Sequence, residues 1–344
     1  MVNSNSRHLL VKRPYPPKLS LVMPFYNEES VIPLLRPEVE AFALEVCSEL
    51  EIILVNDGSR DNTLNLLVNW AKEDDRIKVL DLSRNFGHQI AATAGLDFAT
   101  GNAVVLIDAD LQDPLHVIHE MVERYQEGYD VVYGQRRTRA GESQFKRFTA
   151  WAFYRLMRAI VYKDLPVDTG DFRLVSRTCL DGLRRMRETH RFLRGMVTWV
   201  GYPQTPVTYD RNERVAGQSK YPLRKMLSFA WTAATSFSTL PLKFNLLTGV
   251  LVGLFAFEET LRALIAHAMG RTVSGWTSLM VLTSVIGSSL LIGLAIIGEY
   301  LGKLYEQSKD RPLYLIARTF NKENSERAEQ DITVVQSHAT NAGH

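Results

Sequence analysis

Short apolar runs alternate with longer amphipathic segments through the first half of the chain. The runs are rich in β-branched and aliphatic residues and predict strands at 19–25, 51–56, 77–82, 103–107 and 130–133. Amphipathic segments between them, such as 61–72 and 114–126, predict helices. Strands separated in this way are typical of βαβ units, so we expect an α/β, Rossmann-like fold with a mostly parallel sheet and helices on both faces. Ligands bind such sheets at the carboxyl ends of the strands.

The second half of the chain has a different pattern. Segments 143–162 and 223–240 combine aromatic residues with arginine or lysine and predict helices that lie in a membrane interface or pack on a core. Segment 276–298 carries no charge and is long enough for a transmembrane helix, which needs about 20 apolar residues. Segment 244–257 is shorter and is followed by Glu258, Glu259 and Arg262. We favour a second span there over a re-entrant or buried helix.

Charges around these two segments predict their orientation. Glu258 and Arg262 are four residues apart and can pair on one helix face, near the far interface. The flanks carry the basic residues Lys220, Arg224, Lys225 and Lys243 before the spans and Lys303, Lys309 and Arg311 after them. Because basic residues favour the cytoplasmic side, both flanks are expected there, which requires an even number of spans.

The predicted organisation has five parts. A polar segment 1–18 precedes an α/β domain at 19–221, an amphipathic interface helix at 222–242 and two transmembrane helices within 243–302. A cytoplasmic segment 303–344 follows, with a disordered tail from about 321 because the sequence there is polar and lacks aromatic residues. The first segment has no apolar core of a signal peptide, so we expect the α/β domain to stay in the cytoplasm.

Composition excludes some classes of function. The 344 residues include 40 Lys and Arg and 38 Asp and Glu, a formal net charge of +2, which gives no reason to expect nucleic acid as a partner. A local basic cluster at 136–147 suits phosphates or an anionic membrane. The two cysteines do not form a disulfide framework and fit a reducing compartment.

Two acids follow the fourth predicted strand. In an extended segment Asp108 and Asp110 point to the same side, and two carboxylates so close repel unless a cation or proton lies between them. Mg²⁺ and Mn²⁺ accept oxygen ligands and share their shell with a diphosphate. Gln112 continues the alternation and offers a neutral oxygen, and Pro114 opens a helix. The sequence predicts a divalent-metal site, with a structural turn as the alternative.

Polar residues also follow the first two strands. Tyr26 could pack on a nucleotide base, while Asn27 and Glu28 could hydrogen-bond to the base or ribose; alternatively, Asn27 caps the next helix. Asp57 could bind a base or ribose edge, or belong to a common turn in which Ser59 or Asp61 caps a helix.

Three further segments are candidates for the site. Asp171 could face the reacting carbon or acceptor and pair with Arg173, or both could belong to a turn with a salt bridge. The loop 214–221 has cations at both ends and could bind phosphates, or be a solvated surface loop. His88 lies in a polar loop at 83–88, where a satisfied loop histidine is more common than a base.

Together these segments resemble the family 2 glycosyltransferases with a GT-A fold. The resemblance is closest to the polyprenyl-phosphate glycosyltransferases, which include dolichol-phosphate mannose synthase and bacterial bactoprenol glucosyltransferases. It runs from about Leu19 to Leu315. It rests on the segments 24–29, 56–59, 85–87, 108–114, 169–173 and 217–221, and the two-span ending with 298–302 resembles the bacterial glucosyl branch.

The resemblance implies an inverting transfer and assigns residues to it. Nucleotide-sugar binding falls to Pro24, Tyr26, Glu28, Asp57, Asp108 and Ala109. A divalent metal, Mg or Mn, would be held by Asp108, Asp110 and Gln112. Donor or acceptor phosphates would meet Arg136, Lys146, Arg173, Arg214, Ser219 and Lys220. The catalytic carboxylates would be Asp171 and Asp110.

The activity expected from the resemblance is transfer of a hexose, glucose by preference, from a UDP-sugar to undecaprenyl phosphate. The protein would be multi-pass in the bacterial inner membrane, homo-oligomeric, and associated with a flippase and a downstream glycosyltransferase. Transfer of 4-deoxy-4-formamido-arabinose or mannose is an alternative. A processive synthase is disfavoured, because the chain has no Gln-x-x-Arg-Trp sequence. A non-catalytic nucleotide-sugar-binding membrane partner is a further alternative, against which Asp108, Asp110 and Asp171 argue.

Overall fold

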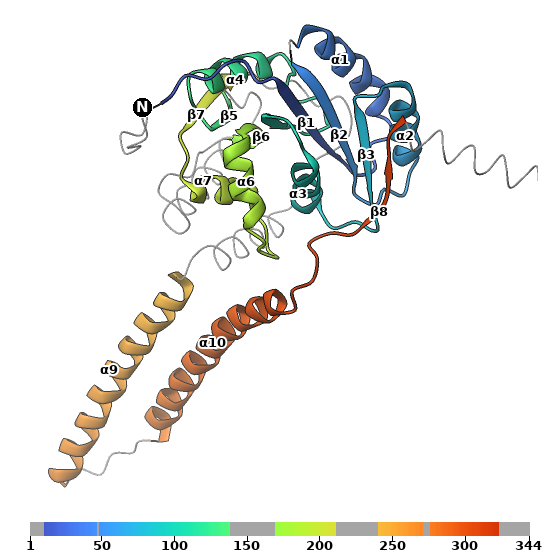
Figure 1. Ribbon diagram of the computed structural model, residues 1–344. Helices are drawn as coiled ribbons and strands as arrows, with labels where there is room; N and C mark the ends of the chain where they lie inside the picture. The colour runs from blue at the N-terminus through green and yellow to red at the C-terminus, as the bar shows by residue number, and fades with distance from the viewer. Residues whose placement is uncertain (1–9, 47, 138–168, 211–239, 271–275, 323–344) are drawn as a thin grey trace, which may run out of the picture. The chain divides into compact units, whose positions relative to one another are not determined.

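The computed structural model describes residues 10–46, 48–137, 169–210, 240–270 and 276–322 (Figure 1). The chain divides into two compact units. The first contains an eight-stranded sheet and the helices that cover it. The second contains two long helices.

The first unit alternates strands and helices. Its strands are β1 (Lys18–Phe25), β2 (Glu49–Asn56), β3 (Ile77–Leu82), β4 (Ala103–Leu106), β5 (Val131–Arg136), β6 (Thr169–Ser176), β7 (Gln204–Tyr209) and β8 (Ile316–Phe320). Its helices are α1 (Ile32–Glu45), α2 (Thr63–Glu73), α3 (His88–Phe98), α4 (Val117–Gln126), α6 (Arg177–Arg185) and α7 (Leu193–Val200). The strand order is β7-β5-β6-β4-β1-β2-β3-β8. β6 and β8 run antiparallel to their neighbours, and the other pairs are parallel.

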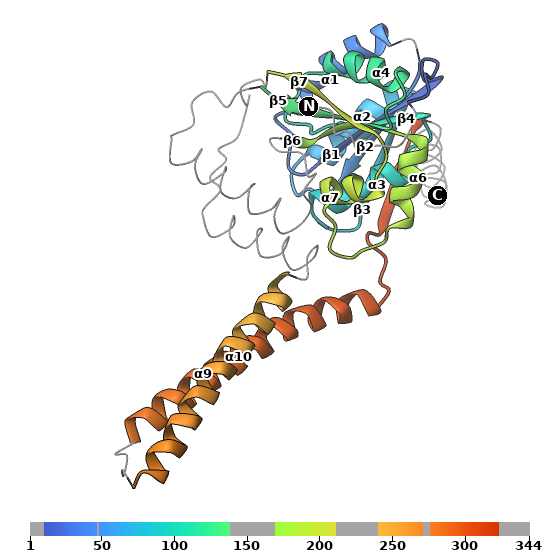
Figure 2. The same cartoon turned by 90° about the vertical axis from the view of Figure 1, so that its left-hand side faces the viewer.

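Helices cover both faces of the sheet, as expected. One core cluster joins the sheet to α1, α2 and α4, and a second joins it to α3, α6 and α7 (Figures 1 and 2). On β1 the side chains of Leu21 and Met23 belong to the first cluster and that of Val22 to the second. This alternation explains why the strands are almost continuously apolar: both of their faces are buried.

The five predicted strands correspond to β1–β5, but the sequence interpretation missed β6. The prediction of a turn around Asp171 is wrong, because Thr169–Ser176 is a buried strand between β4 and β5. Asp171 and Arg173 share one face of it, and Phe172 and Leu174 pack into the first core cluster on the other. Asp171 and Arg173 interrupt the apolar run that is typical of a buried strand, so the sequence pattern did not indicate one here.

The chain beyond the second unit returns to the sheet. β8 pairs with β3, and the guanidinium of Arg318 donates to Asp81 at 3.0 Å. The Tyr314 hydroxyl donates to Asp97 at 2.9 Å, and the Ser83 amide donates to the carbonyl of Leu315 at 2.9 Å. The sheet therefore includes residues outside the range 19–221 that we assigned to the α/β domain.

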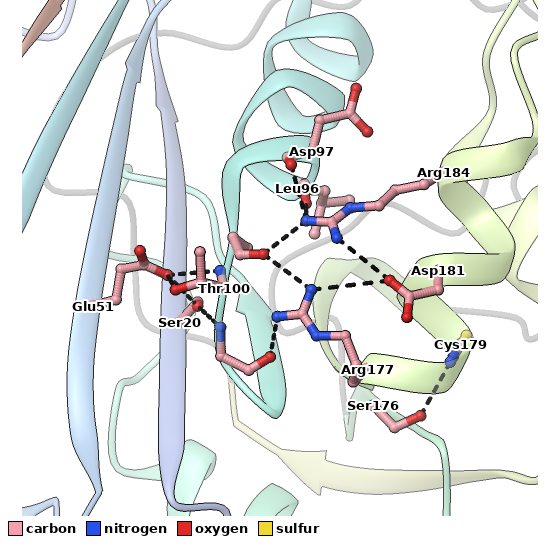
Figure 3. Close-up of polar contacts among 12 residues, drawn as sticks. Ser20, Glu51, Leu96, Asp97, Thr100, Ser176, Arg177, Cys179, Asp181 and Arg184 are labelled. Carbon is pink, nitrogen blue, oxygen red and sulfur yellow. Dashed lines mark hydrogen bonds and ion pairs between the residues drawn. The ribbon is translucent and has the colours of Figure 1, made fainter.

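Two arginines of α6 hold the carboxyl end of α3 (Figure 3). Arg184 donates to the carbonyls of Leu96, Asp97 and Ala99, and Arg177 to those of Ala99 and Gly101. The last carbonyls of a helix lack partners within it and carry partial negative charge, so two cations stabilise this end. The amino end of α3, which begins at His88, lies at the opposite end of a helix that is anchored in this way.

The described part of the second unit contains α9 (Leu240–Ala268) and α10 (Trp276–Ser308), which lie side by side (Figures 1 and 2). A Cβ added to the buried Gly293 would lie 2.9 Å from the Asn245 side chain, so the helices touch there. Arg262 pairs with Glu258 at 2.8 Å, as predicted. Among the described residues one helix is long and apolar enough to cross a membrane: its segment Val281–Ser308 contains an 18-residue window with a mean hydropathy of 2.2. A second span is not established by this measure.

Glu51 forms a buried polar cluster away from the carboxyl ends of the strands. Its carboxylate accepts hydrogen bonds from the Ser20 hydroxyl at 2.7 Å, the Thr100 amide at 2.8 Å and the Lys78 ammonium at 2.8 Å. Burial would raise the pKa of Glu51, but these donors and the charge of Lys78 outweigh it and lower the pKa from 4.5 to about 2. The ionised form is therefore built into the fold.

This cluster predicts how stability depends on pH. Because the folded pKa of Glu51 is depressed, its contribution is present above about pH 4.5 and is lost as pH falls towards about 2. Glu51→Gln should lower the free energy of unfolding at pH 7 by about 2–3 kcal/mol, with the difference shrinking below pH 4.5. Denaturant unfolding of the detergent-solubilised protein, followed by tryptophan fluorescence, measures this.

A control for this variant lies on the same strand. Glu49 is exposed and pairs with Lys18 at 2.8 Å, so Glu49→Gln should cost less than about 1 kcal/mol. Equal losses for the two variants would contradict the special role of Glu51.

Candidate active site

The loops that follow β1 and β2 are joined by hydrogen bonds. The Asn27 amide donates to the Ser59 hydroxyl at 3.0 Å, and the Arg60 amide donates to the Asn27 side-chain oxygen at 2.8 Å. Asn27 has a φ of 55°, which asparagine tolerates better than most residues. The alternative of Asn27 as a helix cap is wrong, because α1 begins at Ile32 and has no side-chain cap.

The predicted nucleotide-binding residues differ in accessibility. Tyr26 is 43% exposed and Glu28 is half-buried, whereas Pro24 and Ala109 are buried. Tyr26 therefore has an open face on which a planar group could stack. The nucleotide-binding roles of these residues stay predictions.

Asp57 ties the loop after β2 to the loop after β3. Its two carboxylate oxygens accept hydrogen bonds from the amides of Phe86 at 2.7 Å and Gly87 at 2.9 Å. Burial raises the pKa of Asp57, and these amides oppose the rise. Gly58 has a φ of 63°, and a Cβ there would lie 2.5 Å from the Arg84 backbone. Asp57 thus shapes the loop that leads to His88, and a ligand would have to share its oxygens.

Asp108 and Asp110 follow β4 at the centre of the sheet. The Oδ1 atom of Asp108 is buried and has no hydrogen-bond partner among the described residues. Burial, together with the charges of Asp171, Asp113 and Asp110, raises the pKa of Asp108 to about 6 despite the nearby His88. His88, whose Nε2 atom is 3.3 Å from the same oxygen, offsets this rise only in part.

Gln112 was predicted as a metal ligand from the alternation of side chains along an extended strand, but the chain at Gln112 is not extended. The chain turns from Ala109 onward, and Leu111 has a φ of 57°, so strand alternation does not continue to Gln112. Gln112 is buried, and its backbone amide donates a hydrogen bond to Asp110 Oδ1 at 3.3 Å. Within the described part of the chain, no group of three His, Cys, Asp or Glu side chains is arranged to hold a metal. Gln112 as third ligand stays a prediction.

Strand pairing brings Asp171 to Asp108. The antiparallel register places Leu106 opposite Arg173, so continuing it past the end of β4 puts Asp108 opposite Asp171. The Nε2 atom of His88 lies between them, 3.3 Å from Asp108 Oδ1 and 3.3 Å from Asp171 Oδ2. Burial lowers the pKa of His88, but the hydrogen bond with Asp171 and the charge of Asp108 outweigh it and raise the pKa.

His88 is the accessible member of this trio. Its side chain is 44% exposed, against 5% for Asp171. The sequence interpretation treated His88 as an ordinary loop histidine, because nothing in the local sequence shows that two acids from other strands lie beside it. Its contact with both makes it a candidate functional residue that sequence reasoning missed.

Asp171 is held by cations and an amide. Arg194 Nε donates to Oδ1 at 2.9 Å, and Gln89 Nε2 donates to Oδ2 at 2.8 Å. Burial would raise the pKa of Asp171, but Arg194, His88 and Arg173 hold it well below its usual range. Arg194 and Gln89 are the other two residues that the sequence did not indicate.

Arg173 pairs with Asp171 at 3.8 Å, as the sequence predicted. Its guanidinium also donates to the carbonyls of Gly170 at 3.1 Å and Asp171 at 3.2 Å. Burial lowers the pKa of Arg173 to about 10. A phosphate-binding role for Arg173 stays a prediction, which its burial does not favour.

Arg136 lies next to the acids. Its Nη2 atom is 3.9 Å from Asp113 Oδ1, which also accepts a hydrogen bond from the Tyr209 hydroxyl. A Cβ added to Gly170 would lie 2.9 Å from Arg136 Nη2, so the guanidinium is beside the start of β6. The predicted phosphate-binding Arg136 is thus in the same region as Asp171. The remaining predicted phosphate ligands, which lie outside the described residues, are Lys146, Arg214, Ser219 and Lys220.

Comparison with known proteins places the chain in a family. The family model described as glycosyl transferase family 2 matches residues 20–184. The uncharacterized glycosyltransferase YkcC of Bacillus subtilis is 45% identical over 309 residues, covering 89% of this chain and 95% of YkcC. The bactoprenol glucosyl transferase of Shigella phage SfX is 39% identical over 300 residues, covering 87% of this chain and 98% of that protein.

Solved structures show a more distant likeness. Glucosyl-3-phosphoglycerate synthase from Mycobacterium tuberculosis, crystallised with Mn²⁺ and UDP, aligns with a TM-score of 0.44 and 17% identity, covering 64% of this chain and 78% of that one. The family assignment rests on the sequence relatives. This chain belongs to glycosyl transferase family 2 and is a glycosyltransferase.

Proposed function

We propose that this glycosyltransferase moves glucose from a UDP-sugar to a polyprenyl phosphate at the cytoplasmic face of the bacterial inner membrane. The observation that carries the proposal is the pair Asp108 and Asp171, which β4 and β6 place around His88 at the strand ends. Relatives that span nearly the same length are named bactoprenol glucosyl transferases, which supports glucose as the sugar and a lipid as the acceptor.

The chemistry needs little proton transfer. One oxygen of the acceptor phosphate forms a bond to the anomeric carbon while the bond from that carbon to the UDP oxygen breaks on the opposite side. A phosphate is already anionic at neutral pH, so no base has to remove a proton. Asp171 is ionised, and its low pKa makes it a weak base. Its role is then to position and stabilise charge at the reacting carbon.

The acids fit a divalent metal. Asp108 offers a buried oxygen without a hydrogen-bond partner among the described residues, and neighbouring acids raise its pKa, so a cation would relieve their repulsion. Asp108 and Asp110 would hold Mg²⁺ or Mn²⁺, with diphosphate oxygens completing the shell. When bound, the ion would stabilise the negative charge of the departing diphosphate.

The contact between α9 and α10 supports two membrane spans. In an antiparallel pair with Asn245 beside Gly293, Arg262 is level with Trp276 and Glu258 with Met280. The uncharged part of α9 is then level with the apolar part of α10, and the ion pairs lie at the end of the hairpin. α9 has 29 residues, about 44 Å of helix, enough to cross a bilayer core of about 30 Å.

The donor is tested with a panel of UDP- and GDP-sugars, using purified protein in detergent and polyprenyl phosphate as acceptor. UDP-glucose should give the highest kcat/KM, and Asp171→Asn should lower kcat by about 100-fold or more, because a group that orients the reaction is lost. Preference for GDP-mannose or a UDP-pentose would replace the glucose assignment. Binding without turnover for every donor would favour a non-catalytic role.

The metal site is tested by Mn²⁺ binding, followed by electron paramagnetic resonance. Asp110→Ala should weaken Mn²⁺ binding in the presence of UDP by more than about 100-fold, since even indirect ligand partners contribute 10- to 100-fold. Asp75→Asn, at an exposed acid that pairs with Lys322, is the control and should bind as the parent does. Unchanged affinity in Asp110→Ala would refute the metal proposal.

The two-span topology is tested with single cysteines in a Cys47→Ser background, where Cys179 is buried. The two substitutions are Met269→Cys, at the residue just beyond α9, and Arg311→Cys, at a residue after α10. In right-side-out spheroplasts an impermeant maleimide should label the cysteine at 269, and should label the one at 311 only after permeabilisation. If the maleimide labelled both cysteines in intact spheroplasts, or labelled both only after permeabilisation, the hairpin would be ruled out.

A further inference from the structure

Gln89, the second residue of α3, connects three parts of the site. Its amide nitrogen donates to Asp171 Oδ2 at 2.8 Å, and its amide oxygen accepts a hydrogen bond from the Leu193 amide at 2.9 Å. Leu193 is the first residue of α7. One side chain therefore links the amino end of α3, the strand β6 and the amino end of α7.

The bond to Leu193 replaces a missing helix cap. The first amides of a helix have no acceptor within it, and Phe192 at the cap position of α7 supplies none from its side chain. Gln89 Oε1 supplies that acceptor from another helix. The orientation of the Gln89 side-chain amide is unambiguous, because the carboxylate of Asp171 needs a donor and the Leu193 backbone amide needs an acceptor.

The cap also determines where Arg194 lies. Arg194 is the second residue of α7, and its Nε atom donates to Asp171 Oδ1 at 2.9 Å. Gln89 thus controls both oxygens of Asp171: Oδ2 by direct contact, and Oδ1 through the end of the helix that carries Arg194. A buried carboxylate with donors on both oxygens has its plane and direction fixed.

The helix that carries Gln89, α3, is held by hydrogen bonds at both of its ends. Arg177 and Arg184 bind the carbonyls at the carboxyl end of α3 (Figure 3). Asp57 binds the amides of Phe86 and Gly87 immediately before its amino end. Since both ends are held, the position of Gln89 follows from the fold rather than from its own rotamer alone.

We propose that Gln89 is a positioning residue for Asp171 and orients its carboxylate towards the reacting carbon by bridging it to α7. The proposal rests on the role of Asp171 in the proposed function. Gln89 itself need not touch the substrate, so its loss should affect turnover more than donor binding.

Two variants separate the halves of the bridge. Gln89→Met keeps the length of the side chain and removes both hydrogen bonds. Gln89→Glu keeps the acceptor for Leu193 and sets a second carboxyl group against Asp171, so its kcat is compared with the parent at a pH high enough to ionise it, where it has no donor for Asp171. Both should lower kcat by about 10- to 100-fold, the range expected when a reacting group is displaced by about 1 Å, and leave KM for the donor within about twofold of the parent. Gln204→Met, on the first residue of β7, is the control with parental kcat and KM.

Hydrogen–deuterium exchange gives a readout that does not depend on activity. Gln89→Met should speed exchange at the amides of 193–195, and Gln89→Glu should leave it at the parental rate. Unchanged exchange in Gln89→Met would overturn the bridge, and so would a kcat within about twofold of the parent. If Gln89→Met does not fold, Gln89→Glu provides the test: a kcat within about twofold of the parent in that variant would overturn the positioning role.

Failure of the proposed function would look different. A parent protein that transfers no sugar to polyprenyl phosphate refutes that function, while the exchange pattern still tests the bridge. An Asp171→Asn variant with parental kcat refutes the role of Asp171, and with it the reason for positioning it.

Discussion

The antiparallel pairing of β6 beside β4 is the constraint on which the site depends. It sets Asp171 opposite Asp108 and buries Asp171, while the side chain of Asp108 stays 27% exposed. Two negative charges so placed would oppose folding unless cations or donors accompanied them. His88, Arg173, Arg194 and Gln89 surround Asp171, whereas among the described residues His88 is the cation beside Asp108.

The unequal surroundings of the two acids fit the different roles proposed for them. Arg194 and Arg173 keep Asp171 ionised, while burial and neighbouring acids raise the pKa of Asp108 to about 6. An acid that is already compensated can hold a fixed charge near a reacting carbon, and one that is only partly compensated attracts a cation. The arrangement suits a transfer that depends on positioning and on neutralising a departing diphosphate more than on moving protons.

The loops at the strand ends are bound to one another as well as to their strands. Asn27 joins the loops after β1 and β2, and Asp57 joins the loop after β2 to the one that leads into α3. Leu315, immediately before β8, accepts a hydrogen bond from the Ser83 amide at the start of the same loop. The segment that follows the apolar helix α10 in the chain thus contributes directly to the frame of the site.

The sequence by itself determined the features that depend on short-range pattern. Apolar runs predicted β1–β5, the Asp108–Asp110 pair indicated the candidate site, and the spacing of Glu258 and Arg262 predicted their ion pair. Strand and helix periods are local properties, so they can be recognised within a few residues.

Only the tertiary structure showed β6 as a strand, β8 as part of the sheet, and His88, Gln89 and Arg194 as partners of Asp171. Each of these depends on residues far apart in the chain. A charged strand such as β6 is stable only because its partners lie on other elements, and a single sequence carries no local sign of which residues those are.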